Sequence, residues 1–299
     1  MHKKRIRINK FGGKCLLCLL IGLACKKNPY MPSTEPIRIE FGNGDDTYGS
    51  NNDSQLPLGS LKIMTYNIHI LNPPSRPGTT DINATADVII KANPDVVFLQ
   101  EVDKNTGRNG YTGDQAAELA KLTKMNVVFY AAIPLNNGFY GTAILSKYPL
   151  KTVKKYLLTK EKDTDEQRVL GTTIVDLPGA DSLMLAVTHL QHNNATNRIR
   201  QVRDLTGILD KEKGRVIIGG DLNEKETATE FFSIFDGSFT RTCKGSSCPL
   251  TSSAQSPKYV IDYLAYKPAS AFSVQQHTVI NEPYASDHLP VVAELNINR

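Results

Sequence analysis

Tryptophan is absent from this chain of 299 residues, and cysteine occurs only five times. Without tryptophan, the sequence does not favour an exposed aromatic hairpin of the kind that enters membranes. The apolar run Cys15–Ala24 has about ten residues, which is too short to span a bilayer. With 40% hydrophobic and 22% charged residues, the composition is that of an ordinary globular protein.

Acidic residues are missing from the first 24 positions, which hold six of the 35 Lys and Arg residues. A basic segment followed by a short apolar core is typical of a secretory signal. It closes with "GLAC", residues 22–25, which resembles the lipobox of bacterial lipoproteins. We therefore expect a signal peptide over 1–24 and lipidation of Cys25, which would anchor the protein to a bacterial membrane on its extracytoplasmic side, in the periplasm or at the cell surface. The alternatives are a signal that is cleaved without lipidation and an uncleaved anchor.

A surplus of positive charge is also lacking once the signal is removed. The mature chain would carry 29 basic residues against 30 acidic ones, a net charge near −1. Such a body lacks the electrostatic footprint of a dedicated DNA-binding protein. Arg198, Arg200 and Arg203 could form a local basic surface on one helix, but a solvated face balanced by Asp204 and Asp210 is the favoured interpretation.

Two of the five cysteines, Cys15 and Cys18, would leave with the signal, and Cys243 and Cys248 remain in the loop "CKGSSC". In an oxidising compartment, two cysteines this close in a Gly/Ser loop are expected to form a disulfide. The alternative is a zinc site, but no further ligands are evident nearby.

Residues 25–59, from the lipidated cysteine onward, are rich in Pro, Asn, Asp, Gly and Ser and are typical of a flexible tether. Beyond them no internal repeat of short period is present, and 60–299 is expected to be one α/β domain. Strands are predicted over 61–70, 95–102, 126–133, 141–150, 183–190, 215–223, 259–266 and 289–297. Helices are predicted over 85–93, 113–124, 194–214 and 227–235.

Polar side chains stand at the ends of most of these strands, where a strand does not need them. Each one alone has an ordinary explanation as a turn, a surface end or a satisfied core residue. A carboxylate at Asp262, between Ile261 and Tyr263, must be exposed at an edge or paired. Together they predict one polar pocket where strand ends converge, formed by Asn67, Glu101, His189, Asp221, Asn223, Asp262, Asp287 and His288.

The residue types in this pocket indicate its chemistry. Carboxylate and amide oxygens are ligands for Mg²⁺ or Mn²⁺ rather than for zinc. Two histidines beside carboxylates are suited to general acid–base catalysis or to phosphate contact. A hard metal ion, a base held by an aspartate and a histidine facing a developing oxyanion together describe phosphoester hydrolysis.

Eight motifs in this order resemble the endonuclease/exonuclease/phosphatase (DNase I-like) superfamily. They are "TYNIH", "DVVFLQEVD", "YGTAILSKYPL", "EQR", "VTHL", "GGDLN", "IDYL" and "SDHLPVVAEL", and they span residues 61–295. Their spacing looks most similar to a compact bacterial branch of metal-dependent hydrolases. The resemblance implies a four-layer αββα sandwich, in which two mixed β-sheets pack face to face with helices outside.

The resemblance also implies a metal side of the pocket. Glu101 would be the central Mg²⁺ ligand, with Asn67 beside it and Asp287 as a second ligand on the metal side.

On the phosphate side, the resemblance implies that Asp221 and Asn223 position the attacking water and a phosphate oxygen. His288, paired with Asp262, would be the general base or a phosphate clamp. His189 would contact the phosphate and act as general acid, and Arg168 of "EQR" would be a further phosphate or structural contact. The chain has Tyr140 where DNase I-like enzymes place a Glu that orients the first catalytic histidine, so the partner that orients His189 is left unassigned.

The sequence thus predicts a monomeric Mg²⁺- or Mn²⁺-dependent phosphoesterase. A small-molecule or lipid-headgroup phosphodiester or phosphomonoester is the favoured substrate, because the domain has little room for the insertions that build nucleic-acid grooves. Two alternatives are an extracytoplasmic nuclease with the same mechanism and a lipid-anchored binding protein that has lost catalysis. Nucleic acid is therefore a possible partner but is not favoured.

Overall fold

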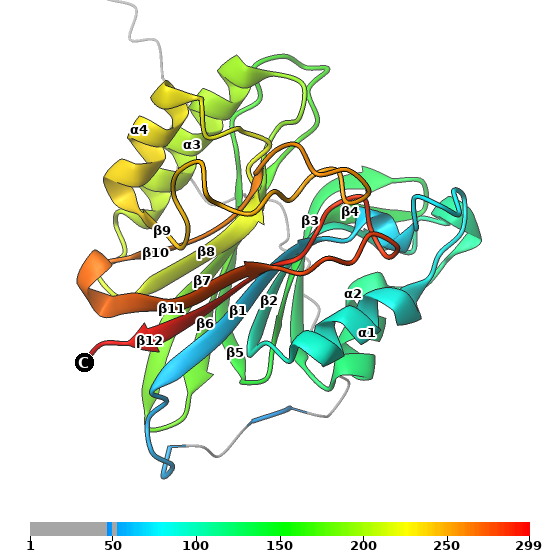
Figure 1. Cartoon of the computed structure of the whole chain (residues 1–299). Helices are drawn as coiled ribbons and strands as arrows, with labels where there is room; N and C mark the ends of the chain where they lie inside the picture. The colour runs from blue at the N-terminus through cyan, green and yellow to red at the C-terminus, as the bar shows by residue number, and fades with distance from the viewer. Residues whose placement is uncertain (1–46, 50–52) are drawn as a thin grey trace, which may run out of the picture.

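The computed structural model describes residues 47–49 and 53–299, and these form two six-stranded mixed sheets packed face to face (Figure 1). The predicted signal peptide, Cys25 and most of the predicted tether lie outside the described residues. The first sheet contains, in spatial order, β11 (Phe272–Val279), β12 (Val291–Ile297), β1 (Ser60–Asn67), β2 (Val96–Lys104), β4 (Gly138–Ser146) and β3 (Asn126–Leu135). The second contains β5 (Leu150–Leu157), β6 (Val169–Leu177), β7 (Asp181–His189), β8 (Val216–Asp221), β10 (Asp262–Lys267) and β9 (Thr240–Arg241).

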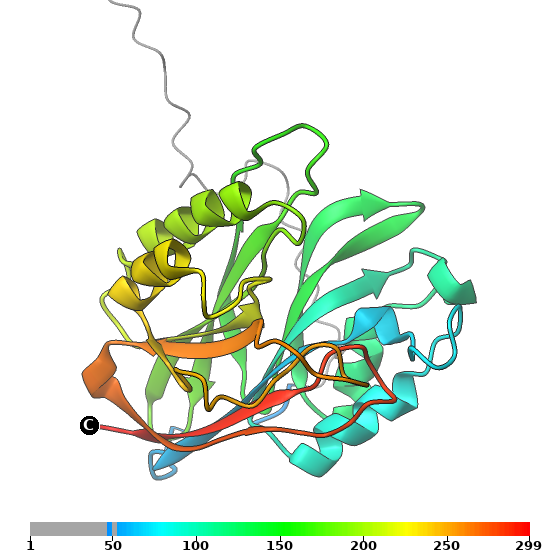
Figure 2. The same ribbon diagram turned by 45° about the horizontal axis from the view of Figure 1, so that its top comes forward.

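Helices cover the outer face of each sheet, which completes four layers (Figure 2). The first sheet packs against α1 (Ile82–Ala92) and α2 (Gln115–Thr123), and the second against α3 (Ala195–Leu209) and α4 (Thr229–Ser238). Short 3₁₀ turns are η1 (His69–Leu71), η2 (Arg108–Gly110) and η3 (Ala269–Ala271). The predicted αββα sandwich is confirmed. None of the helices in the described part of the chain is both long and apolar enough to cross a membrane.

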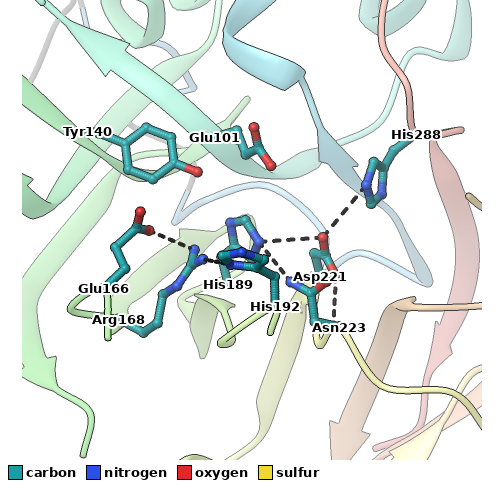
Figure 3. Close-up of a pocket in the computed structure, with 9 residues that line it drawn as sticks. All are labelled: Glu101, Tyr140, Glu166, Arg168, His189, His192, Asp221, Asn223 and His288. Carbon is teal, nitrogen blue, oxygen red and sulfur yellow. Dashed lines mark hydrogen bonds and ion pairs between the residues drawn. The ribbon is translucent and has the colours of Figure 1, made fainter. Parts of the chain in front are cut away.

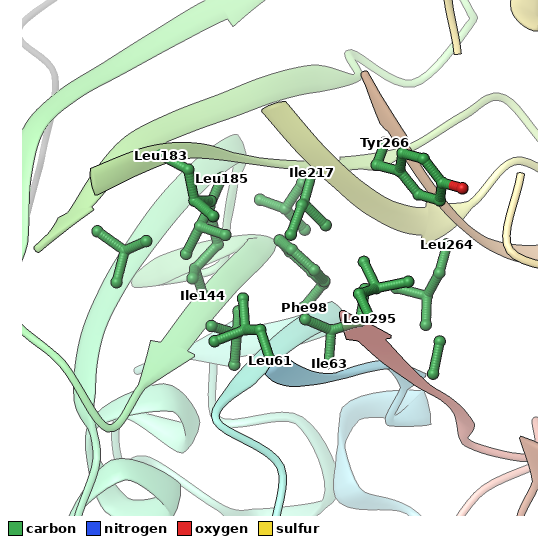
Figure 4. Close-up of a cluster of buried hydrophobic side chains, with 14 of the residues drawn as sticks. Leu61, Ile63, Phe98, Ile144, Leu183, Leu185, Ile217, Leu264, Tyr266 and Leu295 are labelled. Atoms are coloured by element: carbon green, nitrogen blue, oxygen red, sulfur yellow. The ribbon is translucent and has the colours of Figure 1, made fainter. Parts of the chain in front are cut away.

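The core between the sheets follows from the alternation of side chains along each strand (Figure 4). In β1, Leu61 and Ile63 point toward the second sheet, whereas Met64 points toward the helices. In β7, Leu183 and Leu185 face back across the same layer. Both faces of these strands are therefore buried, which explains their nearly continuous apolar sequences.

The predicted helices are all present, with shifted ends. Helix α1 begins three residues earlier than predicted, because the Asp81 side chain accepts a hydrogen bond from the N–H of Ala84 at 3.1 Å and caps it. Helix α3 ends at Leu209 rather than at residue 214, since 210–214 has no apolar side chain to continue the buried stripe.

The sequence prediction missed β6, the two-residue β9, β11 and all but the first residue of β5. Strands β5 and β11 lie at sheet edges and expose most of their middle residues, which weakens the apolar signal. In β6 the signal is weakened by Gly171, where a Cβ atom would lie only 2.5 Å from the ring of Tyr130. Here glycine is required by packing between the sheets.

Part of the predicted tether lies against the domain. The backbone N–H of Tyr48 donates to the Asn126 side chain at 3.0 Å, and the Asn126 amide donates to the Tyr48 carbonyl at 2.9 Å. A disulfide joins Cys243 and Cys248, whose Cα atoms are 5.8 Å apart.

Candidate active site

The strand-end polar residues predicted from the sequence gather at one end of the layer between the two sheets. In β7 the side chains that face this layer are Leu183, Leu185 and Val187, and the next in alternation is His189. The same alternation turns three further polar residues into the layer at strand ends: Asn67 in β1, Asp221 in β8 and Asp262 in β10. The sheet that buries the core therefore also aims these side chains at one another.

Strand register places three of these residues side by side. His189 is the Cα partner of Asp221 in the parallel pair β7–β8, and Asp221 is the partner of Asp262 in the antiparallel pair β8–β10. All three are at most 5% exposed. Burial, and then the neighbouring charge of Asp262, raise the pKa of the Asp221 carboxyl to about 7.

His288 precedes β12 and reaches the same cluster through its ring. Its Nδ1 lies 2.9 Å from Asp262 Oδ2, and its Nε2 lies 3.8 Å from Asp221 Oδ2. Thr251 donates its hydroxyl to Asp262 Oδ2 at 2.6 Å and so fixes that carboxylate from the other side. Although burial alone would lower the pKa of His288, the Asp262 carboxylate outweighs it and raises the pKa to about 10. The ring is therefore an imidazolium at neutral pH.

Asn67 joins the two sheets at the site. Its side-chain amide donates to Glu101 Oε1 and to Asp221 Oδ2, each at 3.1 Å, while its Oδ1 accepts the N–H of His69 at 3.1 Å. Its position beside Glu101 is as expected, but in this arrangement it acts as a hydrogen-bond donor. Its role as a metal ligand stays a prediction.

Glu101 reaches the site because β2 contains one extra residue. Leu99 pairs with Ala143 of β4 and Val102 pairs with Gly141, so three steps along β2 match two along β4. Simple alternation would send Glu101 to the helix side with Leu99. At the bulge Glu101 instead takes a φ of +55°, a left-handed conformation that costs a non-glycine residue about 1–3 kcal/mol. This local strain brings a carboxylate to the cavity.

His189 is oriented by Asn223, the partner that the sequence left unassigned. The Asn223 amide lies 3.0 Å from His189 Nε2 and 3.0 Å from the carbonyl oxygen of Leu190. Burial, and then the positive charge of Arg168, hold the pKa of His189 well below its usual value. The ring is neutral, and its Nε2 accepts the amide hydrogen.

The cluster opens onto a cavity of about 280 Å³ (Figure 3). Its lining residues are Glu101, Tyr140, Glu166, Arg168, His189, His192, Asp221, Asn223 and His288. Tyr140 turns its hydroxyl toward Glu101. The Arg168 guanidinium is buried, with Nη1 3.2 Å from Glu166 Oε1 and Nε 3.3 Å from Gln191 Oε1.

Sequence reasoning did not assign Glu166 or His192 to the site. Both lie inside or beside motifs that it quoted: Glu166 opens "EQR", and His192 follows "VTHL" by two residues. A strand-end criterion could not select them, because they lie on loops. The other prediction to be set against the structure is Asp287, which is absent from the cavity lining. Its side chain is 41% exposed, and its Oδ1 lies 3.8 Å from Nδ1 of His69. A metal role for Asp287 stays a prediction.

Within the part of the chain that the structure describes, a cation could be held by one cluster of three residues or by Glu101. Asp221, Asp262 and His288 offer ligand atoms within 4.8 Å of one another, but the close contacts among them already satisfy Asp262 and Nδ1 of His288. Glu101 is better suited, since it faces the cavity and only one hydrogen bond from Asn67 engages its carboxylate among the described residues. Carboxylate oxygens without thiolates fit a hard divalent cation.

A profile of the Endonuclease/Exonuclease/phosphatase family matches residues 64–288, about three quarters of the chain. This protein belongs to that family. Family members hydrolyse phosphoester bonds, generally with a divalent metal, and the chain is accordingly a phosphoester hydrolase. The match begins in β1 and ends at His288, so it encloses every residue that lines the cavity. No curated protein matches the chain.

Solved structures share this fold. An endonuclease/exonuclease/phosphatase from Beutenbergia cavernae DSM 12333 is 26% identical with a TM-score of 0.66, covering 81% of this chain and 72% of its own. The mannosyl-6-phosphatase Bt3783 of Bacteroides thetaiotaomicron VPI-5482 is 14% identical with a TM-score of 0.63, covering 79% and 99%. ANGEL2, a 2',3'-cyclic phosphatase in complex with adenosine-2',3'-vanadate, is 13% identical with a TM-score of 0.62, covering 88% and 99%.

Proposed function

We propose that this protein is a Mg²⁺- or Mn²⁺-dependent phosphoesterase that hydrolyses a phosphodiester or phosphomonoester of a small molecule or lipid headgroup. The observation that carries the proposal is the cavity itself. It brings a carboxylate for a metal, a carboxylate with a pKa near neutrality, an imidazolium and a buried guanidinium into about 280 Å³.

Glu101 would hold the metal, with Asp287 and Asn67 as its predicted companions. When bound, a divalent cation polarises a phosphoryl oxygen and offsets developing negative charge.

The remaining groups have roles that follow from their charge and contacts. Asp221 accepts a proton from the attacking water, because its carboxyl titrates near neutral pH and lies between the rings of His189 and His288. His288 donates a hydrogen bond to a phosphate oxygen through Nε2. The two roles expected for His288 are general base and phosphate clamp. Its positive charge supports the phosphate clamp, because an imidazolium attracts phosphate and has no free lone pair to accept a proton. His189 and Asn223 line the same cavity, and we propose that they contact the phosphate by exchanging their mutual hydrogen bond for one to a phosphate oxygen. The general-acid role expected for His189 stays a prediction.

A small substrate is supported by the surface charge. The arginines that could have formed a basic groove are paired: Arg198 with Glu224 at 2.8 Å and Arg203 with Glu230 at 3.1 Å, while Arg200 lies 3.9 Å from Glu161. The favoured interpretation as a solvated face holds for Arg200, Arg203 and Asp210, which are exposed, but not for Arg198 and Asp204, which are buried. The names of two proteins with the same fold, a mannosyl-6-phosphatase and a 2',3'-cyclic phosphatase, add support for compact phosphoesters.

The test is a screen of the purified chain with Mg²⁺, Mn²⁺ or EDTA. The panel contains bis-p-nitrophenyl phosphate, p-nitrophenyl phosphate, sugar phosphates, phospholipid headgroup esters, sphingomyelin and plasmid DNA. We expect metal-stimulated hydrolysis of small esters, which Glu101→Ala and His288→Ala each abolish. Full activity in both variants would contradict the site assignment. Salt-sensitive nicking of plasmid would favour the nuclease, and absence of nicking at low salt would remove it.

For localisation we propose a lipid anchor at Cys25 that holds the domain outside the cytoplasm. The proposal is supported by the "GLAC" segment and by the Cys243–Cys248 disulfide, a bond typical of oxidising compartments. Metabolic labelling with palmitate in a bacterial host tests it. The wild type should be labelled and Cys25→Ala should not, and equal labelling of both would overturn the anchor.

A further inference from the structure

Arg198 lies in the first turn of α3, behind the cavity and outside its lining. It is 8% exposed, whereas Arg203 on the same helix has a side chain that is 57% exposed. A buried guanidinium is costly to desolvate unless several partners satisfy its donors. The partners of Arg198 show what this one does.

The Arg198 guanidinium bridges the two loops that carry the phosphate-side residues. Its Nε donates to Glu224 Oε2 at 2.8 Å. Glu224 is the residue directly after Asn223, in the loop that follows β8. Its Nη1 donates to the carbonyl oxygens of Gln191 at 2.9 Å and His192 at 3.0 Å, in the loop that follows β7. One planar fork therefore holds both loops at once.

These two loops meet at the reacting groups. The Asn223 amide donates to the carbonyl oxygen of Leu190 and lies against His189 Nε2, each at 3.0 Å. Near the strands, the N–H of Leu190 donates to the carbonyl oxygen of Asp221 at 3.0 Å and joins the two loops directly. Further out, Gln201 of α3 accepts from the N–H of Gln191 at 2.9 Å, and the Tyr263 hydroxyl donates to the Glu224 carbonyl at 3.0 Å, so each loop is held separately. Arg198 adds the side-chain contact that ties His192 to Glu224 across the two loops.

We infer that Arg198 and Glu224 form a positioning pair during phosphoester hydrolysis. The pair sets the distance between the loop that follows β7, which carries His192, and the loop that follows β8, which carries Asn223. The inference rests on the proposed function. Neither residue touches the substrate; both act through Asn223, His189 and His192. Losing the fork leaves two loop carbonyls without their donor and allows the loops to separate.

The experiment separates positioning from stability by replacing both charges together. Arg198→Met alone leaves Glu224 buried without its partner and should lower both Tm and kcat. Arg198→Met/Glu224→Met removes both charges, and such apolar replacements of buried pairs are often neutral for stability. We expect a Tm above that of Arg198→Met, because no buried charge is left unpaired, but still below wild type, because two carbonyls lose their donor. The kcat per folded molecule on bis-p-nitrophenyl phosphate with Mn²⁺ should be lower by about tenfold or more, with KM changed by less than about threefold. Arg198→Lys keeps the charge without the fork and should retain an intermediate kcat.

The matched control is Arg203→Met/Glu230→Met, an ion pair of the same helix whose side chains are 57% and 67% exposed. Its kcat should stay within about twofold of wild type. The imidazole signals of His189 and His192, followed by NMR, supply a readout that needs no turnover. They should shift in Arg198→Met/Glu224→Met and remain in place in the control.

Two failures are distinguishable. If the wild type hydrolyses no phosphoester with any metal, the proposed function is wrong, while shifted imidazole signals would still support the positioning. If Arg198→Met/Glu224→Met keeps wild-type kcat and unshifted imidazole signals, the pair does not position the loops and the inference is overturned.

Discussion

The two walls of the cavity are built differently. One wall, here called the strand wall, consists of His189 and Asp221 at strand ends, with Asn67 and Asp262 directly behind them. All four are 0–5% exposed and lie on strands of two packed sheets. The other consists of loop residues, among which Arg168 is buried, Glu166 is half-buried and His192 is exposed. Groups on rigid strands keep the geometry that a reaction needs, whereas loops can vary without disturbing the core. The strand wall is thus suited to the common chemistry and the loop wall to the choice of substrate.

The largest effect is expected at the centre of the strand wall. Asp221→Asn removes the proposed proton acceptor without changing the shape of the side chain. We expect kcat on bis-p-nitrophenyl phosphate to fall by about 10²–10⁴-fold with little change in KM. A variant that keeps more than half of the wild-type kcat would show that another group takes the proton.

The same substitution should stabilise the fold in the absence of metal. The Asp221 pKa rises from its ordinary value of 3.8 to about 7 on folding, so its ionisation favours the unfolded chain above pH 7 and has no effect well below pH 4. In EDTA at pH 8 we expect Asp221→Asn to gain about 1–4 kcal/mol in urea unfolding. The gain should vanish as the pH falls below about 4. A variant less stable than wild type at pH 8 would contradict the raised pKa.

The next effect is expected one step behind the strand wall, at Thr251. Thr251→Val keeps the shape but removes the hydroxyl that donates to Asp262 at 2.6 Å. The buried carboxylate loses a donor, so unfolding should cost about 1–3 kcal/mol less. With Asp262 less restrained, kcat should fall roughly tenfold. Thr251→Ser restores the hydroxyl and should recover most of both losses.

A smaller effect, of a different kind, is expected on the loop wall. His192→Ala removes an exposed ring that lines the cavity and whose hydrogen-bonding side-chain partner is Arg168, 3.5 Å away, rather than Asp221 or Asp262. We expect KM to rise by about 2–10-fold, by an amount that differs between sugar phosphates and p-nitrophenyl phosphate, with kcat nearly constant. A uniform loss of kcat across the panel would place His192 with the chemistry instead.

The smallest effect on turnover is expected below the strand wall, in the apolar part of the same layer. A Cβ atom at Gly219 of β8 would lie 2.3 Å from the ring of Phe98. Gly219→Ala should therefore destabilise the fold by about 1–3 kcal/mol while kcat per folded molecule stays close to wild type. A loss of kcat without a loss of stability would mean that packing between the sheets tunes the site directly.

The strand wall could be predicted from the sequence, because apolar strands that end in Asn, His and Asp carry their own signal. The bulge at Glu101 could not, since strand alternation alone turns this residue away from the site and only the extra residue of β2 brings it back. Arg198 was misread for a related reason. Its partner Glu224 lies 26 residues away in the chain, on the loop that follows β8. A helical pattern shows which residues share a face of the helix, but it does not show which other segment packs against that face.

Strand β1 separates the start of the domain from the cavity. The strand begins at Ser60 and delivers Asn67 to the cluster at the cavity roughly 23 Å further on. The attachment point and the catalytic mouth therefore belong to opposite poles of the molecule. Under the predicted lipidation of Cys25, the anchored segment would enter the domain at the end away from the cavity, so that the cavity mouth stays clear of the chain's own attachment.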